Sequence, residues 1–173
     1  MRQVLFIILF VFSFGSIRAQ VTSDSLVMHY MQDIGIPLTY NNKVELLMTG
    51  RDKFVDLFET IRHARHHIHL EYFNFRNDSI ARALFDLLAE KVKEGVTVRA
   101  MFDAFGNWSN NQPLRNYHLK SIRDRGIEIV KFDPITFPYI NHAIHRDHRK
   151  IVVIDGKIGY TGGMNIADYY ING

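Results

Sequence analysis

From residue 52 onward the sequence alternates between two hydrophobic periods, and this alternation limits the fold more than any other feature. Helical spacing of apolar residues predicts helices over 52–66, over a segment capped at Asn77-Asp78 and closed at Gly95, and over a segment from Pro113 to Gly126. Alternating or continuous apolar runs predict strands at 44–48, 68–75, 96–102, 127–132, 151–154 and 157–161. Strands that alternate with helices favour an α/β fold, a layered mixed β-sheet flanked by helices.

The N-terminal segment has a different pattern. Arg2 precedes an unbroken apolar run from Val4 to Val11, and small residues then lead to Ala19. This order predicts a signal peptide over residues 1–19, because the run is shorter than the ~20 apolar residues that span a bilayer. The alternative is an uncleaved membrane anchor. Either way the chain is predicted to be exported, and to be periplasmic or membrane-associated.

The remainder divides into a leader and one domain. Residues 20–43 lack a sustained hydrophobic period and are predicted to form a leader with one short helix at 25–32. Residues 44–173 are predicted to form the domain. The sequence contains no Cys, so this domain must be stabilised by its core and not by disulfides.

The most chemically informative stretch is His148-Arg149-Lys150, followed after four residues by Asp155. The apolar run 151–154 and the turn signal Asp155-Gly156 predict a buried strand that ends in a tight turn. On an extended chain His148 and Lys150 share one face, because side chains alternate between the two faces of a strand. An imidazole beside an ammonium suits a nucleophile or acid/base next to an anion clamp. A solvated basic strand edge is the plainer alternative.

A second polar group follows within ten residues. Gly162-Gly163 lets a backbone approach a ligand closely, and Asn165 is predicted to cap a helix beginning near 166–168. Together with His148 and Lys150, this group indicates a phosphate site.

These residues resemble the HKD motif of the phospholipase D superfamily, and within it most resemble bacterial cardiolipin synthases. The resemblance covers about residues 44–170. It rests mainly on two stretches, 148–156 and 159–165, and four further matches agree with it, at 68–72, 95–99, 102–106 and 146–150. It implies a phospholipase D-like half domain.

The resemblance also implies a two-step phosphodiester exchange that needs no metal and no cofactor. One His attacks phosphorus and forms a phosphohistidine, while a second His protonates the leaving alcohol and then activates the incoming hydroxyl. Carried over by position, His148 is nucleophile or acid/base and Asp155 orients the site. Lys150, Gly163 and Asn165 bind the substrate phosphate. Glu71 is assigned from its place near a predicted strand end, where support of the site is favoured over ordinary surface charge.

Only one such motif occurs in the 173 residues. The resemblance therefore predicts the N-terminal half of a longer protein, whose site is completed by a second HKD half or by a second chain. The predicted function is a phosphatidyltransferase of the cardiolipin synthase type, acting on anionic phospholipid at a membrane surface. Two alternatives stay open: an exported phospholipase D or nuclease that hydrolyses phosphodiesters, with nucleic acid as a partner in the second case, and a non-catalytic phosphate- or lipid-binding half domain.

Other candidate residues receive plainer interpretations. His63, His66 and His67 fall at i, i+3 and i+4 of the first predicted helix, but no carboxylate in helical register accompanies them, so a solvated face is favoured over a metal site. Asp103 lies at a predicted strand end, where ordinary surface charge is the simplest interpretation. Trp108, with Phe105, is equally consistent with insertion into an interface and with packing over the core.

Overall fold

The computed structural model describes residues 23–134, 136–137 and 144–172, which divide into two units between Glu45 and Leu46. In the first unit, the helix predicted at 25–32 is confirmed as α2 (Ser23–Asp33). The predicted signal peptide at 1–19 lies outside the described residues and stays a prediction. No helix in the described part of the chain has both the length and the apolar character to cross a membrane.

The strand predicted at 44–48 is wrong. These residues form neither helix nor strand, and Val44 and Leu46 are 91% and 78% exposed. An apolar run becomes a strand only where a neighbouring strand satisfies its backbone groups, and no strand among the described residues pairs with this segment.

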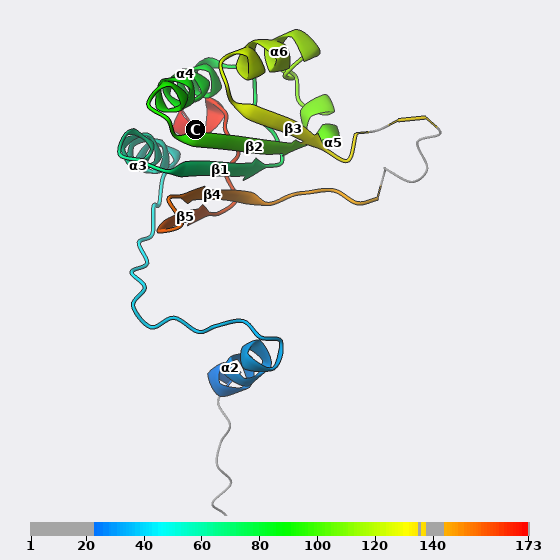
Figure 1. The fold of residues 1–173 in the computed structure, drawn as a ribbon. Helices are drawn as coiled ribbons and strands as arrows, with labels where there is room; N and C mark the ends of the chain where they lie inside the picture. Colours follow the sequence, from blue (N-terminus) through cyan, green and yellow to red (C-terminus); the bar gives the residue numbers. More distant parts are fainter. Residues whose placement is uncertain (1–22, 135, 138–143, 173) are drawn as a thin grey trace, which may run out of the picture. The chain divides into compact units, whose positions relative to one another are not determined.

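The second unit is built on a five-stranded mixed sheet in the order β3-β2-β1-β4-β5 (Figure 1). The strands are β1 (His67–Tyr72), β2 (Thr97–Asp103), β3 (Glu128–Phe132), β4 (Lys150–Ile154) and β5 (Ile158–Thr161). β1, β2 and β3 run parallel, whereas β4 runs antiparallel to β1 and pairs Lys150 with Tyr72. The carboxyl ends of β1–β3 and the amino end of β4 therefore meet at one edge of the sheet. We call it the carboxyl edge.

Helices cover one face of this sheet (Figure 1). They are α3 (Gly50–Arg62), α4 (Ser79–Lys93) and α6 (Asn116–Asp124), with the shorter α5 (Ala104–Trp108) and α7 (Tyr169–Asn172) at the carboxyl edge and the chain end. Alternate strand residues such as Ile68 and Leu70 are buried against Leu57 and Leu84 of the helices. Residues of the opposite parity, such as His69, are mostly exposed or half-buried, and Asp103 at the end of β2 is an exception. The predicted α/β layering is thereby confirmed.

The first helix differs from its prediction at both ends. α3 begins at Gly50, two residues before the predicted start, and Thr49 caps it: the Thr49 hydroxyl oxygen accepts the Asp52 N–H at 3.1 Å. The helix ends at Arg62, so the three histidines predicted on one helical face separate. His63 is the C-cap and His67 already belongs to β1.

Candidate active site at the carboxyl edge

His148 and Lys150 lie at the point where β4 begins. The strand starts at Lys150, so His148 precedes it in an extended segment and its side chain is exposed. Lys150 is buried, and its ammonium turns back to donate a hydrogen bond to the His148 carbonyl at 2.6 Å. The ring of Phe73 meets the His148 imidazole edge-on at 4.8 Å and lies 5.3 Å from the Lys150 ammonium. The structure thus brings the two predicted residues together around Phe73.

The buried ammonium of Lys150 lacks a carboxylate partner. Its side chain is 5% exposed, and no Asp or Glu oxygen lies within 4 Å of its nitrogen among the described residues. Burial lowers the pKa of Lys150, while the charge of Asp147 opposes this effect. A buried charge without a counter-charge is costly, so this position favours the arrival of an anion.

Asn165 is held beside the same strand exit. Its side-chain oxygen accepts the Asn74 N–H at 3.4 Å, and its neighbour Ile166 forms a β-bridge with Phe75. Its amide NH₂ donates to no other group in the described part of the chain and is available to a ligand. Gly163 is exposed, and a Cβ added there would meet nothing within 4 Å. The segment 73–75 therefore joins Asn165 to the His148 group.

The helix predicted to follow Asn165 is wrong. α7 starts only at Tyr169, so Asn165 caps no helix. The Asp168 carboxylate instead supports the first turn of α4, whose N-cap is Asp78, by accepting the N–H groups of Ser79 and Ile80 at 3.2 and 2.8 Å. An N-terminal anion site at this position has no basis in the structure.

Asp155 is the predicted catalytic residue that the structure does not bring to the site. It follows the far end of β4, about 17 Å from Lys150 at the rise of an extended strand. Its carboxylate accepts the backbone N–H groups of Arg65, His66 and His67 at 2.8, 2.8 and 3.0 Å. These hydrogen bonds hold the start of β1 against the β4–β5 turn. Within the described residues Asp155 makes no contact with His148 and so does not orient it.

The electrostatics of Asp155 agree with that structural part. Burial would raise its pKa, but the three backbone N–H groups outweigh burial and lower the pKa to about 2. The folded-state pKa is thus below the ordinary value of 3.8. The stabilisation is present above pH 3.8 and is lost as the pH falls toward 2.

We therefore expect Asp155→Asn to lower the free energy of unfolding at pH 7 by about 1 kcal/mol, because an amide offers one acceptor oxygen to three N–H donors that water can partly reach. The parent should lose this contribution between pH 4 and pH 2, and the variant should not. Urea unfolding across this pH range measures both effects. Asp124→Asn, at an exposed surface pair, is the control. Equal acid sensitivity in parent and variant would contradict the assignment.

Glu71 reaches the segment around His148 through Arg149. The Arg149 guanidinium lies 2.7 Å from the Glu71 carboxylate and 3.1 Å from that of Asp147. Burial raises the pKa of Glu71, and a hydrogen bond with Asp147 adds to the rise. Burial would raise the pKa of Asp147 as well, but hydrogen bonds from Glu71 and Arg149 lower it. The residues on both sides of His148 are thus held by one charged cluster.

Asp103 lies at a strand end as predicted, but the interpretation as surface charge missed that it is buried in the site. It is fully buried, and its carboxylate accepts the N–H of Asp147 at 2.8 Å, the N–H of Gly106 at 2.9 Å and a guanidinium N–H of Arg146 at 3.2 Å. It therefore fastens the segment that carries His148 to the end of β2. The hydrophobic pattern gives no signal of this role.

Phe73 and Gly106 were missed as well. Gly106 belongs to α5, a short helix absent from the elements predicted from the sequence, and a Cβ added there would lie 2.2 Å from the Phe73 carbonyl oxygen. Only glycine permits α5 to pack so closely on the residue that contacts His148. The aromatic-rich strand signal at 68–75 included Phe73, but nothing in it singled out this residue.

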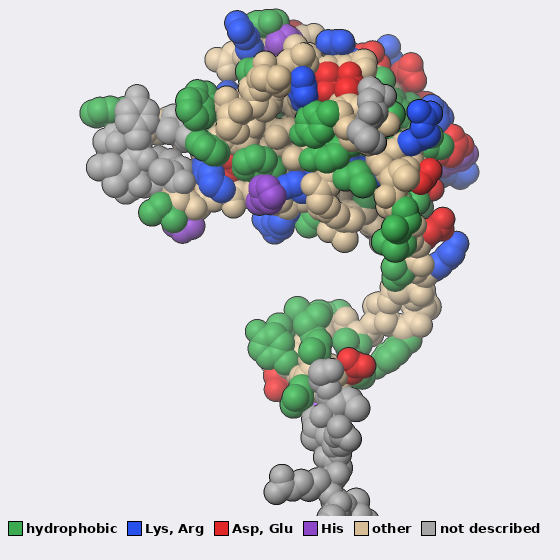
Figure 2. Space-filling view, turned by 180° about the vertical axis from the view of Figure 1, so that it is seen from behind, with side chains coloured by type: hydrophobic (Ala, Val, Ile, Leu, Met, Phe, Trp, Pro, Cys, Tyr) green, Lys and Arg blue, Asp and Glu red, His purple; other side chains and the backbone are tan. Residues whose placement is uncertain are grey.

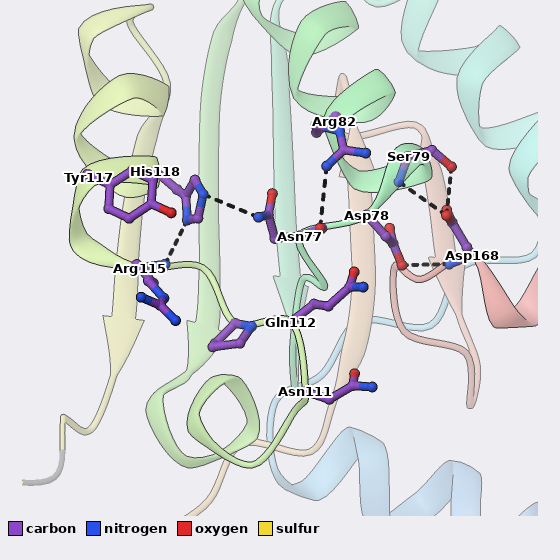
Figure 3. Close-up of a pocket in the computed structure, with 11 residues that line it drawn as sticks. Asn77, Asp78, Ser79, Arg82, Asn111, Gln112, Arg115, Tyr117, His118 and Asp168 are labelled. Carbon is purple, nitrogen blue, oxygen red and sulfur yellow. Dashed lines mark hydrogen bonds between the residues drawn. The ribbon is translucent and has the colours of Figure 1, made fainter.

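A polar hollow of about 590 Å³ lies elsewhere, beside the first turns of α4 and α6 (Figure 3). His118 Nδ1 accepts the Arg115 backbone N–H there at 3.0 Å, and its Nε2 lies 3.2 Å from the Asn77 amide nitrogen. None of the predicted site residues lines this hollow, so it is separate from the His148 group. Within residues 23–134, 136–137 and 144–172, no cluster of three His, Asp or Glu side chains could hold a metal ion.

Comparison of this chain with known protein sequences indicates its family. Residues 57–172 match the family described as cardiolipin synthase, phospholipase D-like domain. A cardiolipin synthase of Halalkalibacterium halodurans is 40% identical over 136 residues, which are 78% of this chain and 26% of the relative. One of Geobacillus thermodenitrificans is 38% identical over 147 residues, which are 84% of this chain and 28% of the relative. The chain spans about a quarter of the length of these curated relatives.

Solved structures agree on the fold. A phosphatidylserine synthase from Haemophilus influenzae matches with a TM-score of 0.58 at 16% identity, over 73% of this chain and 29% of the other. NucT from Helicobacter pylori matches with a TM-score of 0.53 at 18% identity, over 70% and 71%. These likenesses confirm the predicted fold, and the sequence match gives its family. The chain belongs to the phospholipase D-like family of the cardiolipin synthases.

Proposed function

We propose that this chain supplies one half of the active site of a phosphatidyltransferase of the cardiolipin synthase type. The observation that carries the proposal is the buried, carboxylate-free ammonium of Lys150 bonded to the backbone of an exposed His148. A cation that lacks a counter-ion suits a phosphodiester oxygen, and an exposed imidazole beside it suits attack on phosphorus. The cardiolipin synthase relatives support the choice of lipid chemistry.

In the proposed first step, a nitrogen of His148 attacks phosphorus. A P–N bond forms, the P–O bond to the leaving alcohol breaks, and that alcohol takes a proton from a second histidine. The second histidine belongs to a second half, in the same chain or in another one. Lys150 and the Asn165 amide stabilise the oxygens on which negative charge develops.

In the proposed second step, the hydroxyl of an incoming lipid alcohol attacks phosphorus and the P–N bond breaks. The second histidine takes the hydroxyl proton, and the free imidazole of His148 is restored. With phosphatidylglycerol as donor and acceptor, the products are cardiolipin and glycerol. The phosphate-binding group works on anionic phospholipid at a membrane surface. The proposal gives Asp155 no chemical step.

An activated diester tests the first step with this chain alone. The leaving group of bis(p-nitrophenyl) phosphate departs without protonation, so attack by His148 needs no acid from a second half. We expect a burst of nitrophenolate and an acid-labile phosphoryl adduct on the peptide that contains His148, detected by mass spectrometry. His148→Ala should abolish both, whereas His145→Ala, in the same segment, should retain them.

Product analysis tests the lipid chemistry. Given phosphatidylglycerol vesicles, the protein joined to its second half should form cardiolipin and glycerol. Phosphatidate as the main product would instead indicate hydrolysis by a phospholipase D, and cleavage of DNA would indicate a nuclease. An unchanged burst in His148→Ala would overturn the catalytic assignment.

A further inference from the structure

Two large aromatic side chains stand exposed on the short helix α5. Trp108 is 73% exposed and Phe105 is 39% exposed, and their ring centroids lie 5.6 Å apart. Contact with water is unfavourable for both rings, and the core of the unit is filled by other residues. Tryptophan and other aromatic rings favour the boundary between water and lipid, where an apolar body and a polar edge are both satisfied.

This aromatic pair is rigidly attached to the candidate active site. α5 begins at the buried Asp103, which caps it and also holds the segment before His148. Gly106, between the two aromatic residues, packs directly on the backbone of Phe73, whose ring contacts the His148 imidazole. The pair therefore lies at the rim of the site, and Figure 1 shows α5 at the carboxyl edge.

Positive charge accompanies the pair. Asn107 of α5 forms two hydrogen bonds with the Leu114 backbone, at 2.8 and 3.0 Å, which places the exposed Arg115 next to the helix. No carboxylate lies within 4 Å of the Arg115 guanidinium in the described part of the chain. The side chain of Arg149, adjacent to His148, is 64% exposed but pairs with Glu71 and Asp147, so Arg115 is the cation that accompanies the aromatic pair. Hydrophobic side chains with Lys, Arg and His beside them are visible at this end of the molecule in Figure 2.

We propose that Phe105 and Trp108 insert into the surface of an anionic phospholipid bilayer and hold His148 and Lys150 at the depth of the headgroups. The inference rests on the proposed function, because it assumes that the substrate stays in the bilayer. The phosphodiester of a phospholipid lies among the headgroups of the bilayer. The active site can reach it only if the rim of the site enters the boundary between water and lipid. Exposed aromatic rings with Arg115 beside their helix provide the apolar and the electrostatic contributions to such contact.

The chain carries its own probe, because Trp108 is its only tryptophan. On addition of phosphatidylglycerol vesicles, its emission should shift to shorter wavelength, and brominated acyl chains should quench it. Phosphatidylcholine vesicles should produce a smaller change, because they lack the anionic attraction. Emission that stays unchanged with phosphatidylglycerol vesicles at saturating protein binding would overturn the inference.

Substitutions separate membrane contact from chemistry. Phe105→Ala with Trp108→Ala should weaken sedimentation with phosphatidylglycerol vesicles at least about tenfold, given the apolar area removed. The burst with bis(p-nitrophenyl) phosphate should be unchanged, because within the described residues the ring that contacts His148 and Lys150 is that of Phe73 and not that of Phe105 or Trp108. Val130→Ala, at a half-exposed position on β3, should leave vesicle binding intact. Equal binding by parent and double variant would overturn the inference.

The two proposals fail in different ways. Vesicle binding through Trp108 without any adduct on His148 would overturn the proposed function and support the membrane contact. An adduct on His148 with no response of Trp108 to vesicles would overturn the membrane contact and support the proposed function.

Discussion

Lys150→Met should abolish most of the reaction with bis(p-nitrophenyl) phosphate while leaving the fold in place. Methionine fills nearly the same buried volume as lysine but carries no charge. The expected loss in the burst rate is about 10²- to 10³-fold, the range found when one preorganised donor to a developing oxyanion is removed. Because burial already opposes the charge of Lys150, the free energy of unfolding should change by no more than about 1 kcal/mol.

The comparison that makes this result specific is Lys157→Met. Lys157 is exposed in the turn between β4 and β5, and its replacement should affect neither rate nor stability. A Lys150→Met protein that retains the parental burst would show that the buried ammonium is not what holds the phosphate. If Lys150→Met unfolds the protein, Lys150→Gln is the variant to test in its place. Glutamine keeps a hydrogen-bond donor on a side chain of similar length and should recover part of the rate.

The layers of the fold could be predicted because they depend on local periodicity. The alternation of Ile68, Leu70 and Tyr72 along β1 indicates both a strand and its buried face. The Asp78 cap of α4 is equally local, since its oxygen accepts the N–H three residues on, at Ala81. The prediction of a strand at 44–48 was wrong for the opposite reason. Whether an apolar run forms a strand depends on a partner strand elsewhere in the chain, which the sequence of the run itself does not reveal.

The site was only partly predictable, for the same physical reason. The spacing of His148 and Lys150 is local, and the structure keeps them together. The partners of Asp155 lie about 90 residues earlier in the chain, at Arg65–His67, and no spacing rule reveals them. Asp103 is similar, because its donors in the site segment, Arg146 and Asp147, are 43 and 44 residues away. An acidic residue at a strand end carries no mark that tells a surface charge from a buried one.

Asp103→Ala should destabilise the protein more than any other single change considered, and should also impair the His148 site. The substitution leaves the buried N–H groups of Asp147 and Gly106 and a guanidinium N–H of Arg146 without their acceptor. Breaking a buried, charged hydrogen-bond group by removing one partner costs about 3 to 5 kcal/mol. Urea unfolding at pH 7 measures this loss directly.

The position of His148 gives the second measurement. Without the bond from Asp147 to Asp103, the segment preceding β4 loses its attachment to β2, so the imidazole no longer has a fixed place beside Lys150. The adduct rate per folded molecule should therefore fall by about 10²-fold, as expected when a reacting group is misplaced. A positioning role predicts that this loss appears in the maximal burst rate and hardly in the substrate concentration for half-saturation.

Two substitutions isolate the role of Asp103. Asp133→Asn removes a contact with Arg146 at 2.7 Å but leaves the Asp147 N–H paired, so it should cost less in both measurements. Asp124→Ala, at an exposed surface pair, should change the free energy of unfolding by no more than about 0.5 kcal/mol. If Asp103→Ala lowers stability as expected but its folded molecules form the His148 adduct at the parental rate, then Asp103 supports the fold alone. The site is then positioned by the Glu71–Arg149 cluster instead.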